Sequence, residues 1–268
     1  MSNKPYCRTS INYSVSLEDR VAGEIDVYDG RAHLELSWQH NGFELLSHRS
    51  EVSDWDDHRA VREVYYGEME TLARELSGAR VAIISSHINR NPDVAAKHAD
   101  YGPIQFVHSD FGDDYGEFLR AYYQEDDPHA QLTRERHGLT KQDFVDAQRV
   151  ILLQFWRNVG EPVMDMPLVL CDSRSVCRED LLQFKMPGYG GNGRAFDAFV
   201  VKPPRHDAHR WYTFTPLSQD EVIVIRTFDS AAVAQGEPYW TPHSAIHDPM
   251  VVAAAPRRSI EVRAMCLF

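Results

Sequence analysis

Residues 105–110 read Gln-Phe-Val-His-Ser-Asp, an apolar run that ends in a His-x-Asp triplet. Side chains at positions i and i+2 of a β-strand lie on the same face of the sheet. If this stretch is a strand, His108 and Asp110 project together and offer two metal ligands side by side. We therefore predict a strand over 105–110 that carries two thirds of a metal site.

The third ligand of such a site is expected far along the chain, and His243 is the best candidate. Two histidines and one carboxylate on one face of a metal are the ligand set of non-haem Fe(II) oxygenases, which leaves the opposite face open for co-substrate and dioxygen. A chain with 13 histidines contains chance His-x-Asp pairs, so the distal His and its context carry the prediction. A carboxylate at Asp110 fills the position that a halide needs, which argues against halogenation.

Basic residues that follow His243 suggest what the open metal face binds. Arg257 with Ser259 two residues later can bind the far end of a dicarboxylate, through paired hydrogen bonds and a hydroxyl. This pattern predicts a keto acid that chelates the iron. Strand alternation places Glu261 and Arg263 on the same face, so Arg263 is a rival for the carboxylate and Glu261 could neutralise either arginine.

The length and composition are those of one soluble domain. The chain has 268 residues, of which 43% are hydrophobic and 25% charged, and such a chain can bury a sizeable core. The formal net charge of −12 argues against a nucleic-acid partner, because phosphate binding requires clustered Lys and Arg. No apolar run approaches the roughly 18 residues of a membrane span. We predict a single domain over 1–268, with no nucleic-acid or membrane partner.

The cysteines indicate a reducing compartment. Cys7, Cys171, Cys177 and Cys266 form no C-x-x-C pair, and the first 30 residues lack the pattern of a signal peptide. We therefore expect a cytoplasmic protein. A thiol nucleophile at Cys171 or Cys177 is a weak alternative, because no His or Asp stands at a suitable spacing beside either residue.

Helical patterns gather in the first half of the chain. The expected elements are an N-terminal arm (1–30), strands at 33–36 and 43–46 around the Asn41-Gly42 turn, and helices at 53–78, 113–137 and 141–148. Gly78 suits the left-handed cap of the first helix. The second helix is acidic and is expected on the surface. A buried strand over 79–85 precedes a polar loop, from which His87 and Arg90 could face the site.

Short apolar runs dominate the second half and predict a β-sandwich. They lie at 150–156, 168–170, 198–201, 210–214, 222–225 and 260–265, separated by turn residues. Ligands on one strand and a distant third ligand suit a jelly roll that closes around its metal. Trp156 and Arg157 end an apolar run and could meet substrate. The Gly-rich segment 188–193 lacks the context of a phosphate loop, and is expected to be a mobile loop or a lid over the metal.

Ten short blocks support a more specific interpretation. They are Asn-Gly-Phe (41–43), Tyr-Tyr-Gly-Glu (65–68), Gly-Ala (78–79), Val-His-Ser-Asp (107–110), Phe-Trp-Arg-Asn (155–158), Pro-Leu-Val-Leu-Cys-Asp (167–172), Asp-Glu-Val (220–222), Phe-Asp-Ser (228–230), Pro-His-Ser-Ala (242–245) and Pro-Arg-Arg-Ser-Ile-Glu-Val-Arg (256–263). Their order resembles the Fe(II)/2-oxoglutarate-dependent hydroxylase/desaturase family. That family includes the bacterial cephalosporin 7-alpha hydroxylase, fungal gibberellin desaturases and fungal aziridine-forming oxidases.

The resemblance implies a fold, a cofactor and a type of reaction. The implied fold is a mainly β, α+β double-stranded β-helix, that is a cupin-like jelly roll with flanking helices. The implied ligands of Fe(II) are His108, Asp110 and His243, with 2-oxoglutarate held by Arg257 and Ser259. The implied reaction is hydroxylation, desaturation or ring formation at an unactivated C–H bond of a small secondary-metabolite or amino-acid-derived molecule. One departure is Arg258, which stands where the family commonly has an acidic residue.

Two other classes of protein remain open from the sequence. One is a catalytically inactive jelly roll that binds a ligand, and the other is a cupin-type metal enzyme that uses no keto acid. Dependence of activity on added 2-oxoglutarate separates them from the leading interpretation.

Overall fold

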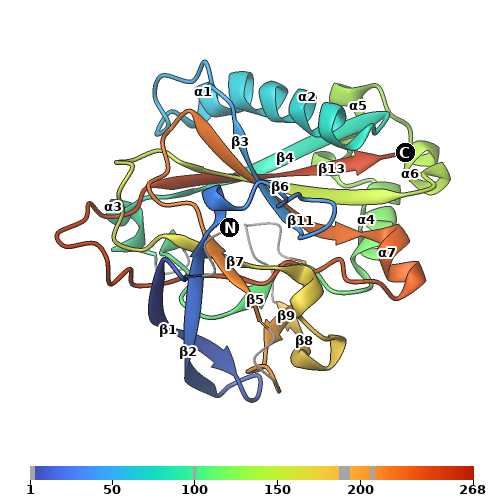
Figure 1. Ribbon diagram of the computed structural model, residues 1–268. Helices are drawn as coiled ribbons and strands as arrows, with labels where there is room; N and C mark the ends of the chain where they lie inside the picture. The colour runs from blue at the N-terminus through green and yellow to red at the C-terminus, as the bar shows by residue number, and fades with distance from the viewer. Residues whose placement is uncertain (1–3, 99–100, 187–193, 206–208) are drawn as a thin grey trace.

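Two β-sheets pack face to face, and helices cover the outer face of one of them (Figure 1). The computed structural model describes residues 4–98, 101–186, 194–205 and 209–268. In order across the larger, eight-stranded sheet, the strands are β1 (Cys7–Ser14), β2 (Arg20–Asp29), β10 (Trp211–Thr213), β7 (Leu168–Cys171), β12 (His243–Ala245), β5 (His108–Ser109), β9 (Phe196–Val201) and β8 (Leu181–Met186). The five-stranded sheet runs β3 (Phe43–Ser47), β11 (Glu221–Asp229), β6 (Val150–Asn158), β13 (Ser259–Leu267) and β4 (Val81–Arg90).

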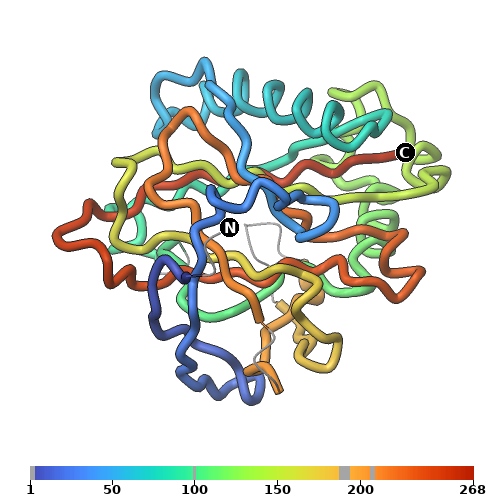
Figure 2. Tube along the Cα trace, in the orientation of Figure 1, coloured from blue at the N-terminus to red at the C-terminus, as the bar shows by residue number. Residues whose placement is uncertain are grey.

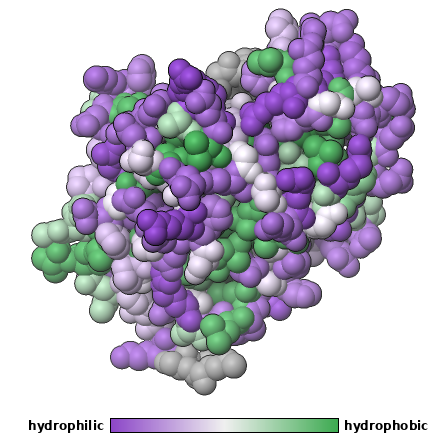
Figure 3. Space-filling model, turned by 90° about the horizontal axis from the view of Figure 1, so that it is seen from above, coloured by the Kyte–Doolittle hydropathy of each residue, from purple (hydrophilic) through white to green (hydrophobic). Residues whose placement is uncertain are grey.

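The helices are short and lie mostly in the first half of the chain. They are α1 (His58–Ala60), the π-helical turn η2 (Val61–Tyr65), α2 (Tyr66–Ser77), α3 (Pro92–Ala95), α4 (Tyr115–Gln124), α5 (Pro128–His137), α6 (Lys141–Asp146) and α7 (Ser230–Gln235), with 3-10 turns η1 (Gly30–Ala32), η4 (Ser173–Ser175) and η5 (Arg178–Asp180). The predicted helix over 53–78 is confirmed as α1, η2 and α2, and it ends at Gly78 with φ of 74°. Seen from the side of α1 and α2, the surface is mostly hydrophilic (Figure 3).

The five-stranded sheet separates a helix-facing core from the interior of the sandwich. Strand β6 is buried along its whole length, so both of its faces must pack. Leu153 and Phe155 join a cluster with Met69 of α2, whereas Trp156 belongs to a second cluster that lies between the two sheets. The side chains of β6 that alternate with Leu153 and Phe155 therefore point toward the larger sheet, where the site lies.

The predicted N-terminal arm is instead part of the larger sheet. Strands β1 and β2 pair antiparallel, from Cys7 with Val27 to Ser14 with Arg20, and β2 pairs parallel with β10. Figure 2 shows this hairpin in dark blue at the lower edge of the molecule. Apolar residues on its inner face, including Ile11 and Tyr13, are buried in the core. Their burial explains why a segment with a polar overall composition is ordered.

Three further predictions differ from the structure. Residues 33–36 form no strand, because the amides of His33 and Leu36 close turns on Gly30 and His33. Strand β4 runs on to Arg90, so the predicted loop begins later. The helix predicted over 113–137 is two helices, since the chain breaks before Pro128 and Asp127 caps the second one. The predicted strands at 43–46 and through the second half are confirmed, with boundaries shifted by a few residues.

Candidate metal centre

Strand pairing brings the two predicted histidine ligands face to face. Strand β12 pairs antiparallel with β5, and His243 is the direct partner of His108. The two imidazole rings lie 4.3 Å apart, centroid to centroid. Strand β5 comprises only His108 and Ser109, which is shorter than the predicted strand over 105–110, and Asp110 follows it directly.

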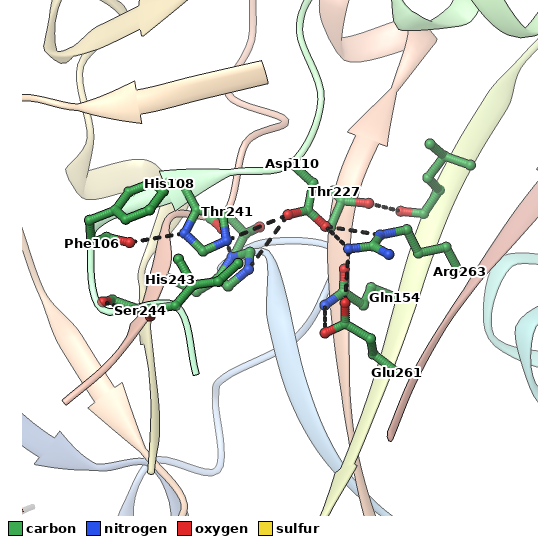
Figure 4. Close-up of polar contacts among 12 residues, drawn as sticks. Phe106, His108, Asp110, Gln154, Thr227, Thr241, His243, Ser244, Glu261 and Arg263 are labelled. Atoms are coloured by element: carbon green, nitrogen blue, oxygen red, sulfur yellow. Dashed lines mark hydrogen bonds and ion pairs between the residues drawn. The ribbon is translucent and has the colours of Figure 1, made fainter. Parts of the chain in front are cut away.

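The hydrogen bonds of both imidazoles leave one nitrogen of each for a metal. His108 Nδ1 donates to the Phe106 carbonyl over 2.9 Å and His243 Nδ1 donates to the Thr241 carbonyl over 3.0 Å. A carbonyl only accepts, so Nδ1 carries a proton in each ring, and in the neutral form of the ring Nε2 keeps its lone pair. Both Nε2 atoms face Asp110 Oδ1, at 3.8 Å from His108 and 3.7 Å from His243 (Figure 4).

These three side chains form a group that fits a divalent metal. One ligand atom from each of His108, Asp110 and His243 lies within 4.8 Å of the others. Burial, followed by the proximity of His243, lowers the pKa of His108 to about 4, so this imidazole is neutral at physiological pH. Burial alone would raise the pKa of Asp110, but Arg263 and the two imidazoles hold it well below its usual range. Neutral imidazoles and an ionised carboxylate are the forms that bind metal.

The backbone behind His243 is fixed by a close approach to Gly42. Thr241, whose carbonyl accepts from His243, donates its hydroxyl to the carbonyls of Gly42 and Arg226, over 3.2 and 2.7 Å. Gly42 has φ of +92°, and a Cβ there would lie 2.2 Å from Thr241 Oγ1. The Asn41-Gly42 turn that the sequence predicted before β3 therefore also supports the metal centre.

Arg263 binds the oxygen of Asp110 that faces away from the imidazoles. Its Nε and one terminal nitrogen donate to Asp110 Oδ2, over 3.1 and 2.9 Å. The same guanidinium donates to Glu261 over 3.2 Å, and Arg90 donates to that carboxylate over 3.4 Å. Figure 4 shows Asp110 between the histidines on one side and Arg263 on the other.

The surroundings of Arg257 differ from those of Arg263, which binds two carboxylates. It is 5% exposed and donates to the Met166 carbonyl over 2.9 Å, with its guanidinium 5.5 Å from the ring of Trp156. Among the described residues it forms no salt bridge, and its Nε and the Ser259 hydroxyl are buried without a hydrogen-bond partner. Burial, with repulsion by Arg90, lowers the pKa of Arg257 to about 9, so a buried and poorly compensated charge persists at neutral pH.

A cavity of about 570 Å³ connects these groups. His108, Asp110 and His243 lie in its wall, together with Arg257 and Arg263. Ser259 does not contribute to the wall, although it is buried at the start of β13. A volume of this size lies within the range of sites that enclose a drug-sized ligand.

An aromatic face borders the metal centre. Tyr115 and Phe118 of α4, Phe111 after Asp110, and Phe196 of β9 line the cavity. The rings of Phe111 and Tyr115 stack at 3.9 Å, and those of Tyr115 and Phe118 at 5.2 Å. The helical spacing of these aromatic residues was evident in the sequence. The prediction of a surface helix was nevertheless wrong for this face of α4, because Tyr115 contacts Phe111, Phe196 of β9 and Phe228 of β11, and the spacing does not reveal these partners.

Other residues singled out in the sequence have mixed outcomes. His87 and Arg90 line the cavity, from β4 instead of a loop. Trp156 also lines it, whereas Arg157 lies fully buried elsewhere and donates to the carbonyls of His48 and Gln219.

Three further predictions concern an arginine, the cysteines and a loop. Arg258 pairs with Asp56, at the surface. Burial raises the pKa of the Cys171 thiol to about 12, which makes it a poor nucleophile. The segment 188–193, where a lid was predicted, lies outside the described residues.

Gln154 of β6, which the sequence did not single out, lines the cavity and donates to Glu261 over 3.4 Å.

The packed sheets and the central His-Asp-His group define a jelly-roll protein with a candidate metal site. A family model described as "YDMC: Oxidoreductase/YMDC permease-like domain" matches residues 3–267. The chain belongs to this family of oxidoreductases. Across the residues that the structure describes, no helix combines the length and apolarity that crossing a bilayer requires.

Curated relatives carry the names that the sequence resemblance predicted. Hydroxylase/desaturase CTB9 of Cercospora beticola is 26% identical, over 98% of this chain and 87% of that protein. The Fe(II)/2-oxoglutarate-dependent dioxygenase nvfI of Aspergillus novofumigatus is 25% identical, over 78% of this chain and 68% of that protein. The predicted relationship to the hydroxylase/desaturase family is confirmed.

A solved structure shares the fold of the whole chain. The iron and alpha-ketoglutarate-dependent endoperoxidase NvfI superimposes with a TM-score of 0.79 at 19% identity, over 100% of this chain and 99% of that one. The predicted jelly-roll fold is therefore confirmed.

Proposed function

We propose that this chain is a non-haem Fe(II)/2-oxoglutarate-dependent oxygenase, with His108, Asp110 and His243 as the iron ligands. The observation that carries the proposal is the convergence of both Nε2 atoms and Asp110 Oδ1 on one point of a buried cavity. Two neutral imidazoles and one carboxylate fit Fe(II) and leave further coordination positions free. When bound, iron and 2-oxoglutarate supply an oxidant that can remove hydrogen from an unactivated carbon.

Arg257 is the residue that we assign to the distal carboxylate of 2-oxoglutarate. A buried guanidinium without a carboxylate partner among the described residues is a binding site for an anion. The Ser259 hydroxyl, which the sequence predicted to assist, is also buried without a partner, but it does not line the cavity, so the assignment rests on Arg257. Arg263 is less suited to this role, because Asp110 and Glu261 already bind its guanidinium.

The substrate is a small molecule, and we propose that it is mostly apolar and contains rings. Beside the metal centre the cavity presents Phe111, Tyr115 and Phe118, and flat ring systems pack favourably on such faces. Among the charged groups that line the cavity, Arg263 pairs with Glu261 and Arg194 pairs with Asp127. This pairing favours a secondary metabolite over a charged amino acid.

A pair of ring compounds that differ in charge tests the proposed substrate class. Protein loaded with Mn(II) and 2-oxoglutarate should bind 9-anthracenemethanol more tightly than anthracene-9-carboxylate, in a fluorescence titration. Phe118→Lys should reverse or abolish this preference, because it adds a positive charge to the cavity wall, while Leu132→Lys on the exposed side of α5 should preserve it. Equal or tighter binding of the carboxylate by the unmodified protein would contradict the proposed class.

Co-substrate turnover tests the proposed activity without knowledge of the substrate. Aerobic protein with Fe(II) should convert 2-oxoglutarate into succinate and CO₂ slowly, and His243→Ala should lose this reaction. Absence of succinate at any Fe(II) concentration would favour the cupin-type enzyme or the inactive jelly roll.

The proposal also covers the domain organisation, the cellular location and the partners of the protein. We infer one domain over 1–268, which the continuous packing between the sheets supports. A cytoplasmic location is consistent with four free cysteines, three of them buried. The net charge of −12 supports small molecules over nucleic acid as partners. Size-exclusion chromatography with limited proteolysis tests the first of these features, because a single domain should yield no stable half-length fragment.

A further inference from the structure

The two oxygens of Asp110 have different surroundings. Oδ1 faces both imidazole Nε2 atoms, at 3.8 and 3.7 Å, and Oδ2 accepts two hydrogen bonds from Arg263, at 3.1 and 2.9 Å. The Asp110 side chain is 8% exposed and that of Arg263 is 25% exposed. Two charged N–H donors on a single carboxylate oxygen hold that oxygen on the side away from the imidazoles.

Arg263 is itself held in place by a chain of charges. Glu261, 4% exposed, accepts from Arg263 over 3.2 Å and from Arg90 over 3.4 Å. Gln154, the cross-strand partner of Arg263, donates to the other oxygen of Glu261. The acceptors on Glu261 and Asp110 lie on either side of one guanidinium, so its orientation is determined from both directions.

We propose that Arg263 is a positioning residue that keeps Asp110 a monodentate metal ligand. This inference rests on the proposed function, because it presumes that the His-Asp-His group binds a divalent metal. A chelating keto acid needs two coordination positions and dioxygen needs a third. A carboxylate that bound through both oxygens would occupy one of these three, and the hydrogen bonds to Oδ2 prevent this. Arg263 thus keeps three coordination positions free for the keto acid and dioxygen. Arg257 remains available to bind the co-substrate.

Metal binding without turnover tests this role. Anaerobic titration with Co(II) reports affinity, and the d–d absorption of the bound ion reports the number and geometry of its ligands. Arg263→Gln should weaken Co(II) binding roughly 10- to 100-fold, as is typical when the partner of a metal ligand is removed, and should change the d–d spectrum. Arg263→Lys keeps the charge but replaces the planar guanidinium by an ammonium group, so its affinity should be intermediate.

Arg258→Gln is the matched control. Arg258 lies in the chain segment that leads into the same strand, but it pairs with Asp56 at the surface, so both the affinity and the spectrum should match those of the unmodified protein. Circular dichroism establishes that each variant is folded, and Arg263→Lys provides the test if Arg263→Gln does not fold.

The outcomes separate this inference from the proposed function. If the unmodified protein binds no Co(II), the metal assignment fails, and the role of Arg263 fails with it. If the unmodified protein binds Co(II) and both Arg263 variants match it in affinity and spectrum, only the positioning role is overturned. A weaker affinity and a changed spectrum in Arg263→Gln, with partial recovery in Arg263→Lys, would establish it.

Discussion

Arg257 and Arg263 stand on the same face of one chain segment and yet have different surroundings. Arg263 binds two carboxylates, whereas Arg257 is buried against Trp156 and forms no salt bridge among the described residues. Strand alternation predicted that both face the site, but it could not predict which carboxylates they would meet. The partner of Arg263, Asp110, is 153 positions away in the sequence.

The different surroundings of the two arginines predict different effects of substitution. Arg257→Gln should raise the dissociation constant for 2-oxoglutarate roughly 10- to 100-fold, because hydrogen bonds to charged groups contribute about 1.5–3 kcal/mol. Its affinity for Co(II) alone should be unchanged. Isothermal titration with each component separates the two effects, and Arg258→Gln should alter neither. A variant that loses metal affinity but retains co-substrate affinity would reverse our assignment.

Gly42 is the second residue whose role is local and specific. Gly42→Ala adds a methyl group 2.2 Å from Thr241 Oγ1 at a φ of +92°, so we expect a loss of roughly 1–3 kcal/mol in unfolding free energy and weaker metal binding through Thr241 and His243.

Gly78→Ala is the control for Gly42→Ala. Gly78 has φ of +74°, but a Cβ there meets nothing within 4 Å. This variant should lose about 1 kcal/mol and keep full metal affinity. Urea unfolding and Co(II) titration measure both quantities, and equal effects of the two substitutions would remove Gly42 from the support of the metal centre.

At the scale of elements, helix α4 depends on its neighbour α6. Phe144 of α6 stacks on Tyr123 of α4, with ring centroids 4.2 Å apart and an angle of 10° between the planes. A capping box between Thr140 and Asp143 fixes the start of α6. The short helix α6 thus helps to hold the aromatic wall of the cavity in place.

Loss of this cap should destabilise the protein modestly. Thr140→Ala removes the hydroxyl that accepts from the Asp143 amide, and such caps contribute about 1 kcal/mol. Thr71→Ala, at an exposed position inside α2, should be neutral or slightly stabilising, because alanine favours the helix. Chemical denaturation compares the two variants. Equal stability of Thr140→Ala and the unmodified protein would show that tertiary packing alone holds α6.

At the scale of the whole molecule, Arg31 and Glu221 connect the two sheets. Arg31 follows β2 of the larger sheet, and Glu221 begins β11 of the smaller one. Two hydrogen bonds of 2.6 and 2.9 Å join them. The hydrogen bonds from Arg31 lower the pKa of Glu221 below its ordinary value.

This pair predicts a pH dependence of stability. Because the folded-state pKa is lowered, the pair stabilises the protein above the unfolded pKa of about 4.3, and the effect is lost as pH falls through the folded pKa. Glu221→Gln should therefore cost about 1 kcal/mol at pH 7, and the difference should close below about pH 4. Glu63→Gln, in an exposed pair with Arg59, should change little. A Glu221→Gln deficit that persisted undiminished at pH 3 would contradict this account.

The sequence predicted which three side chains lie together better than it predicted their surroundings. His108, Asp110 and His243 could be chosen because spacing and residue type are local properties. The N-terminal hairpin was missed, because its polar outer face hides the few buried residues on its inner face. The contact of Arg263 with Asp110 was missed for another reason: it depends on how β5 of one sheet lies against β13 of the other, which no local pattern reports.

The central claim is that His108, Asp110 and His243 hold iron that 2-oxoglutarate can chelate. Anaerobic titration of the metal-free protein, first with Fe(II) and then with 2-oxoglutarate, tests it most directly. We predict a weak visible metal-to-ligand charge-transfer band that requires both components and disappears in His243→Ala. Iron binding without this band, or a band that survives in His243→Ala, would contradict the account.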